Sequence, residues 1–139
     1  MSTNYILTPD GELYHYGVKG QKWGVRRDRA KRARIGYRIA ERYASNSKSI
    51  QRLERSRRTK ESKSKSTDKI DAKIDKLSKR NQILDSVYRK TVSDLSPDDI
   101  NRGKQFCLAI NRVNYSYLNK LGRNIRTDWY VDRHYDRLE

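Results

Sequence analysis

The sequence predicts an all-α protein: an elongated helical bundle or coiled coil of three to four helices, preceded by an N-terminal hairpin or extended arm. From residue 28 onward, apolar side chains recur at steps of three, four and seven residues, which is the spacing of one helix face. Four of the seven glycines and one of the two prolines lie before that point. Ile, Leu, Val and Phe make up only 27 of the 139 residues, so we expect an extended body with a small core.

The first predicted unit is an arm formed by residues 1–27. Two β-prone runs, residues 5–8 and 12–16, flank Pro9-Asp10-Gly11, and this order of residues favours a tight turn between strands. A two-stranded hairpin is only marginally stable alone in water. We therefore expect the arm to lie against another surface.

Three further units follow along the chain. Residues 28–58 predict a basic helix with one apolar face. Residues 59–67 carry no apolar side chain and predict a polar linker. Residues 68–139 predict a helical hairpin or bundle with a short C-terminal helix, and Thr67 or Asp68 is expected to cap its first helix.

The helix that starts near residue 68 carries a heptad pattern. Its seam positions alternate at four and three residues and are Ile70, Ile74, Leu77, Asn81, Leu84 and Tyr88. A seam interrupted by one Asn is typical of a coiled coil in which the Asn sets the register. An intramolecular bundle face and an oligomerisation surface fit it equally well, because fewer than three heptads are short for an independent zipper.

Helix-start and helix-stop residues divide the C-terminal part. Ser96 and Pro97, followed by two carboxylates, predict a helix start. Gly122 predicts the stop of that helix, and Thr127-Asp128 predicts the cap of a short last helix. Cys107 is expected as a small buried residue on an apolar face. The aromatic residues expected to cover the core of these helices are Tyr115, Tyr117, Trp129, Tyr130 and Tyr135.

Charge is the strongest compositional signal. Lys and Arg number 33 against 17 Asp and Glu, and the net charge of +16 predicts an acidic partner. Residues 17–38 hold nine cations against Asp28 alone, and we expect no acidic partners one helical turn away that would neutralise them. Phosphate contacts that release counterions would relieve this repulsion, whereas the alternative interpretation is a solvated helix face. The expected nucleic-acid-binding residues are Arg29, Lys31, Arg32, Arg34 and Arg38.

The segment from Tyr14 to Arg27 has the densest pattern in the chain. Three glycines are separated by two and three residues, four cations surround them, and Val18, Trp23 and Val25 supply apolar side chains. These features are typical of a peptide that docks on a partner. A loop that packs the hairpin on the first helix would use the same residue types.

This segment resembles a motif found near the ends of many proteins encoded in the head and structural gene clusters of tailed bacteriophages and prophages, His-x-Gly-Val-Lys-Gly-Met-Lys-Trp-Gly-Val-Arg-Arg. Gln21 stands where that family usually has Met. The resemblance implies association with the virion and says little about residues 28–139. The matching residues, which it implies dock on the partner, are His15, Gly17, Val18, Lys19, Gly20, Lys22, Trp23, Gly24, Val25, Arg26 and Arg27.

The sequence carries no catalytic or metal-binding signature. His15 and His134 lie far apart, and no motif of a serine, cysteine or zinc-dependent hydrolase is present. We expect no catalytic residue, no metal and no cofactor. Cys107 is the single cysteine, which excludes an internal disulfide, and no apolar run predicts a membrane span or a secretory signal.

We therefore expect a non-enzymatic structural protein of a phage virion, assembled in the bacterial cytoplasm and held in or on the head. Its expected partners are the capsid, the portal or another head protein, with packaged DNA or an acidic capsid surface facing the basic helix. No membrane partner is expected, and a homo-oligomer follows if the seam pairs between copies. The alternatives are a capsid-assembly scaffold that oligomerises by a coiled coil, and a nucleic-acid-binding or host-inhibitory protein delivered with the genome.

Overall fold

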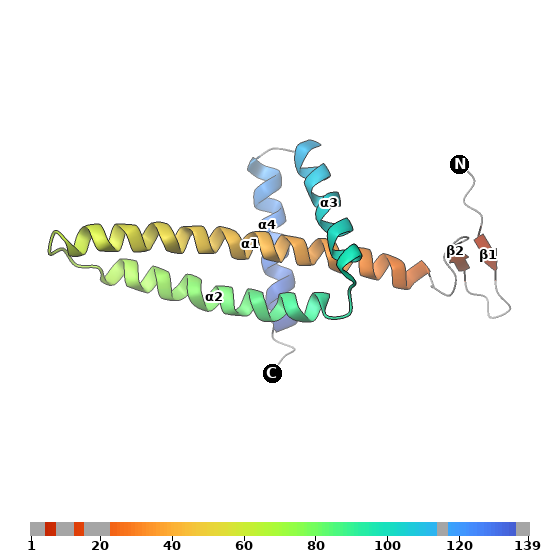
Figure 1. The fold of residues 1–139 in the computed structure, drawn as a ribbon, viewed down its shortest axis with the longest axis horizontal. Helices are drawn as coiled ribbons and strands as arrows, with labels where there is room; N and C mark the ends of the chain where they lie inside the picture. Colours follow the sequence, from red (N-terminus) through yellow and green to blue (C-terminus); the bar gives the residue numbers. More distant parts are fainter. Residues whose placement is uncertain (1–4, 8–12, 16–22, 114–116, 136–139) are drawn as a thin grey trace.

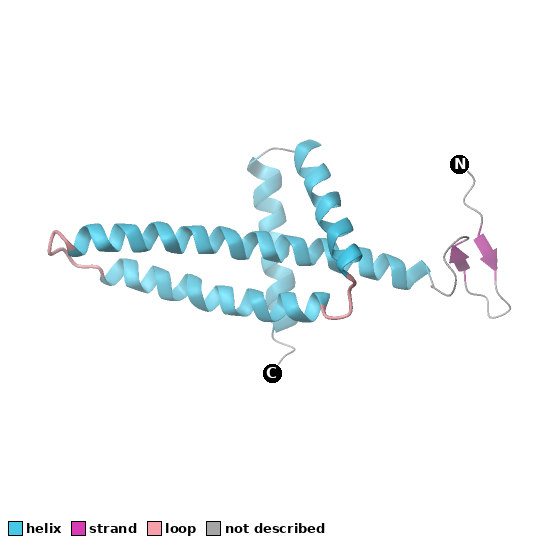
Figure 2. Ribbon diagram, viewed as in Figure 1, coloured by secondary structure: helices cyan, strands magenta, loops and turns pink. Residues whose placement is uncertain are grey.

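The structure is a computed structural model that describes residues 5–7, 13–15, 23–113 and 117–135. The described part is mainly helical, which confirms the predicted all-α class (Figure 2). Two short strands precede four helices. The elements are β1 (Tyr5–Leu7), β2 (Leu13–His15), α1 (Trp23–Glu61), α2 (Asp68–Val92), α3 (Pro97–Val113) and α4 (Tyr117–Tyr135).

The helices are arranged around α1, the longest of them. α2 runs back along α1 in the opposite direction, while α3 and α4 lie across this pair (Figure 1). α3 packs on α1, and α4 contacts both α1 and α2. At 39 residues, α1 extends about 58 Å, since each helical residue adds about 1.5 Å.

The two strands form an antiparallel pair. Tyr5 lies opposite His15, Ile6 opposite Tyr14, and Leu7 opposite Leu13. The predicted turn at Pro9-Asp10-Gly11 lies outside the described residues.

The bounds of α1 differ from the predicted basic helix at both ends. It begins at Trp23, inside the predicted arm, and continues to Glu61, inside the predicted linker. Local bonds support the extra C-terminal turn: Thr59 Oγ1 donates to the Arg55 carbonyl at 3.1 Å, and Arg57 pairs with Glu61 at 3.0 Å. The Arg57–Glu61 pair offsets part of the weak helix propensity of this Ser- and Thr-rich segment.

The connection from α1 to α2 is a Schellman turn. The Lys65 amide donates to the Lys60 carbonyl, and the Ser64 amide donates to the Glu61 carbonyl, both at 3.0 Å. Ser64 has a φ of 51°, the left-handed conformation that glycine usually supplies at this position. Thr67 occupies the N-cap of α2, but its side chain makes no cap bond and donates to Asp71 Oδ2 instead.

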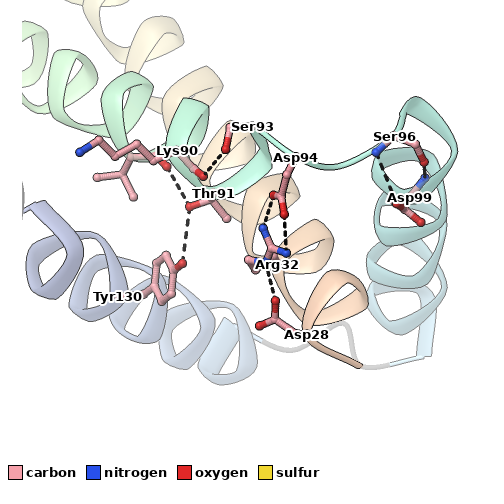
Figure 3. Close-up of polar contacts among 10 residues, drawn as sticks. Asp28, Arg32, Lys90, Thr91, Ser93, Asp94, Ser96, Asp99 and Tyr130 are labelled. Atoms are coloured by element: carbon pink, nitrogen blue, oxygen red, sulfur yellow. Dashed lines mark hydrogen bonds and ion pairs between the residues drawn. The ribbon is translucent and has the colours of Figure 1, made fainter. Parts of the chain in front are cut away.

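α3 begins at Pro97, as predicted, with a reciprocal capping box. The Asp99 amide donates to Ser96 Oγ at 3.2 Å, and the Ser96 amide donates to Asp99 Oδ2 at 3.3 Å (Figure 3). Farther along α3, Gly103 and Cys107 are buried, and Cys107 is only 2% exposed, as predicted. Small residues at these two positions allow α3 to approach α1 closely.

The predicted break between the last two helices is wrong. Gly122 and Thr127-Asp128 lie inside α4, not at a helix end. Thr127 Oγ1 donates to the Arg123 carbonyl at 2.8 Å, a bond within the helix, and Asp128 pairs with Arg42 of α1. Tertiary contacts override these local signals: Asp128 pairs with Arg42, and Thr127 and Val131 are buried, so the continuous helix is stabilised by its packing.

The main core lies where α1, α2 and α4 meet. Its fully buried members are Ile39, Leu84, Val87 and Val131, and Tyr130 and Tyr135 pack against them. Trp129, expected to cover the core, is instead 60% exposed. The side chains of Tyr115 and Tyr117 lie outside the described residues.

Candidate partner-docking and nucleic-acid interface

The structure describes the two ends of the predicted docking motif but not the residues between them. His15 is the last residue of β2. Trp23, Gly24, Val25, Arg26 and Arg27 form the first residues of α1. The motif residues that lie outside the described part are Gly17, Val18, Lys19, Gly20 and Lys22.

The helical end of the motif is open to solvent. A Cβ added at Gly24 would meet no atom of the described chain within 4 Å, and the conformation there is one that any residue can adopt. Val25 is 43% exposed. Nothing in the described fold therefore requires a glycine at position 24, in contrast to Gly103, where an added Cβ would lie 2.6 Å from the backbone of Ala33.

The N-terminal end of α1 carries positive charge, which is unfavourable there. Its first turn contains no acidic residue, and Arg26 and Arg27 follow directly. Cations near a helix N-terminus are repelled by the positive end of the helix dipole. An anion from outside the chain would relieve this repulsion.

Arg32 is the predicted nucleic-acid-binding residue that the structure assigns to another role. Its guanidinium donates to Asp28 at 2.8 Å and to both carboxylate oxygens of Asp94 (Figure 3). The hydrogen bond from Arg32 holds the pKa of Asp94 below its usual value, and the same contact raises the pKa of Arg32. The expectation that the basic cluster lacks an acidic partner one turn away is therefore wrong for Arg32.

The other four predicted nucleic-acid-binding residues are not tied to acids by any ion pair within the described part of the chain. Lys31 is exposed. Arg29 and Arg34 line a cleft of about 580 Å³ between α1 and α3. Arg38 lines a second cleft of about 470 Å³, to which α1, α3 and α4 contribute. Tyr37 lies beside Arg38 in the chain, and burial together with Glu41 raises its pKa.

The seam of α2 faces α1 within the same chain. Ile70, Asn81 and Leu84 are buried, and Ile74, Leu77 and Tyr88 are half-buried. Asn81 Nδ2 donates to Ser47 Oγ of α1 at 3.2 Å. The predicted oligomerisation residues thus serve the packing of α2 on α1.

Sequence reasoning missed the contributions of α3 and α4 to these sites. Arg102 and Phe106 come from α3 to line the α1–α3 cleft, and the Arg34 guanidinium lies 4.5 Å from the centre of the Phe106 ring. Arg80 of α2 pairs with Asp128 and Asp132 of α4. Arg102 and Phe106 are four residues apart, so the sequence could have predicted that they share one face of a helix. It could not predict that α3 crosses α1.

Within the described ranges, no group of three or more His, Cys, Asp or Glu side chains is placed to hold a metal ion. Among the helices of the same ranges, none combines the length and apolar character that crossing a membrane requires.

Comparison with known proteins places one similarity on the N-terminal part of the chain. Residues 7–30 match the model of a family of unknown function, DUF7211. No curated protein and no solved structure matches the chain. The matched range includes the whole segment from His15 to Arg27 and the first residues of α1.

Proposed function

We propose that this protein is a non-enzymatic structural component of a tailed-phage virion, which docks on the capsid, the portal or another head protein through the segment from His15 to Arg27. α1 then carries its cations from the docking point toward packaged DNA or an acidic capsid surface. Residues 23–61 hold fourteen Lys and Arg against four Asp and Glu, which supports an anionic neighbour.

The observation that carries the docking proposal is the open surface at Gly24 and Val25. Glycine favours a helix less than alanine does, and no described contact within the chain explains a glycine at position 24. A partner backbone that approaches α1 at this point would explain it. The resemblance to phage head proteins covers this same position, which is why we assign the partner to the head.

The seam supports a virion component over a capsid-assembly scaffold. A scaffold that oligomerises through α2 would need the seam on its surface, whereas Asn81 and Leu84 are buried against α1. Mass spectrometry of purified particles separates the two functions. A virion component is retained in mature particles, and a scaffold is absent or present only in trace.

Gly24→Ala tests the docking proposal without harming the fold. We expect the variant to be at least as stable as the wild type, because alanine favours the helix and the site is open, but to lose binding to purified major capsid or portal protein. Gly122→Ala is the matched control, since it too lies in a helix with open space and is outside the motif. Gly24→Ala binding equal to that of Gly122→Ala would remove the docking proposal.

A second variant addresses the undescribed part of the motif. The pair Trp23→Ala and Gly20→Ala removes an apolar side chain and a glycine that the resemblance places at the docking surface. We expect the same loss of capsid or portal binding in a pull-down with the full chain. Undiminished binding of this double variant would contradict the proposal independently of Gly24.

A further inference from the structure

The α1–α3 cleft gathers four guanidinium groups around one space. Arg26, Arg29 and Arg34 come from α1, and Arg102 comes from α3. Asp99 is the one acidic residue of the lining, and its carboxylate already accepts the Ser96 amide in the α3 capping box. The cleft therefore has an excess of positive charge with donors suited to phosphate oxygens.

Arg32 differs from the four cleft arginines in its charge balance. Arg32 lies on the same helix between Arg29 and Arg34, yet two aspartates neutralise it. For the four cleft arginines, the described residues supply no ion pair of this kind. Arg26 also lies in the first turn of α1, where the helix dipole adds to the positive potential.

Phe106 gives the cleft a flat apolar surface. Phe106 is 45% exposed as a residue although it lines the cleft, and the Arg34 guanidinium lies 4.5 Å from the centre of its ring. Aromatic rings and arginine planes of this kind stack on the bases of single-stranded nucleic acids. The cleft of about 580 Å³ has the size of a small-ligand pocket, so a nucleotide can enter it.

The same face of α1 continues into the second cleft. Arg38 and Lys48 recur near the spacing of that face, and Lys120 and Arg123 of α4 line the opposite wall. Arg42 also lines this cleft but pairs with Asp128, and Glu41 is the acidic residue of the lining. From Arg29 to Lys48 the helix rises about 28 Å, at about 1.5 Å per residue. Two adjoining cationic clefts that together cover this length suit an extended polyanion better than a single small anion.

From these observations we propose that the α1–α3 cleft binds a single nucleic-acid strand, with phosphates on Arg29 and Arg102 and a base against the Phe106 ring. The inference deepens the proposed function, on which it rests, because it takes nucleic acid rather than an acidic protein as the anionic neighbour of α1. The second cleft receives the continuation of the strand.

The test measures binding of the full chain to a fluorescein-labelled 20-nucleotide single strand, to the matching duplex and to poly-glutamate, by anisotropy over a range of salt concentrations. Arg29→Gln with Arg102→Gln removes two cleft charges and leaves the docking motif intact. Arg55→Gln with Arg58→Gln removes the same charge from exposed positions on α1 away from both clefts. Circular dichroism verifies that both variants remain helical.

We expect the cleft variant to weaken single-strand binding about tenfold more than the control variant, and to reduce the salt slope by about 1.4, since each lost phosphate contact on a single strand removes about 0.7. Phe106→Leu keeps all charges and should weaken single-strand binding about tenfold, with less effect on the duplex. Arg29→Lys with Arg102→Lys should retain most of the salt slope.

Three results would overturn the inference: equal losses for the cleft and control variants, no single-strand binding by the wild type at low salt, or poly-glutamate binding as tight as that of DNA with no effect of Phe106→Leu. The last result would assign the cleft to an acidic protein. None of these results bears on the proposal that the protein docks on the virion, because Arg29 and Arg102 lie outside the docking motif. Docking is tested separately, by binding to capsid or portal protein.

Discussion

At the scale of single residues, the ion pair between Arg32 and Asp94 joins α1 to the segment that follows α2 (Figure 3). Its hydrogen bonds lower the pKa of Asp94 in the folded state. A group with a lowered folded pKa contributes stability above its unfolded pKa, about 3.9 for Asp, and loses that contribution as the pH falls through the folded value. The ion pair therefore stabilises the fold at neutral pH, and this contribution is lost when Asp94 is protonated in acid.

Asp94→Asn should reveal this pH dependence. We expect the variant to unfold at a lower temperature than the wild type at pH 7, and the difference to shrink as the pH falls below about 4. Thermal unfolding followed by circular dichroism between pH 7 and pH 2 measures it. A difference that stayed constant down to pH 2 would show that the carboxylate of Asp94 does not act through its charge.

Ser64 is the second residue whose local geometry makes a prediction. It holds the left-handed position of the Schellman turn, with a φ of 51°. This conformation costs a non-glycine residue about 1–2 kcal/mol. Ser64→Gly should therefore stabilise the protein by about 0.5–1 kcal/mol in urea unfolding. Lys63→Gly, at the neighbouring position without positive φ, should destabilise it, and equal effects of both changes would refute the strain.

At the scale of helices, α3 packs on α1 through residues without bulk. A Cβ at Gly103 would lie 2.6 Å from the Ala33 carbonyl carbon and 2.7 Å from its Cβ, and the backbone of α1 cannot yield as a side chain can. Gly103→Ala should cost about 1–3 kcal/mol through overpacking. Gly122→Ala, where the nearest atom is 3.9 Å away on a flexible arginine, should instead stabilise the protein by about 0.5–1 kcal/mol. If both substitutions changed the unfolding free energy in the same direction, the close approach of α3 to α1 would be contradicted.

How much of the helical architecture was predictable depends on whether a signal is local. The start of α3 was predicted because Ser96 and Asp99 bond within four residues of each other. Gly122 and Thr127 gave equally good local signals for a break, and these failed because Asp128 is held by Arg42, 86 residues away. Propensity is a weak prior that such tertiary contacts override.

The candidate site divides in the same way. Its cations are visible in the sequence, but which of them are available to a ligand is decided by partners far along the chain. Arg32 and Asp94 are 62 residues apart, and nothing in either local pattern pairs them. Phe106 and Arg102 join the cleft only because α3 crosses α1.

At the scale of the whole molecule, the pairing of α1 with α2 satisfies the heptad seam inside one chain. With a net charge of +16, two copies also repel each other. We therefore expect the purified chain to have a molar mass of 16.5 kDa in solution, as measured by light scattering after size-exclusion chromatography. A dimer mass at physiological salt would instead indicate that α2 is an oligomerisation surface.

Asn81 decides between these two roles more sharply. Its Nδ2 donates to Ser47, but its buried Oδ1 has no hydrogen-bond partner among the described residues. Ser47 also donates to the Tyr43 carbonyl at 3.0 Å, so it keeps a partner if Asn81 is replaced. Asn81→Leu should leave the mass unchanged and raise the unfolding free energy by about 0.5–1 kcal/mol, because a buried unsatisfied acceptor is removed. In a coiled coil between chains, where the Asn fixes register and oligomer state, the same substitution would instead change the mass.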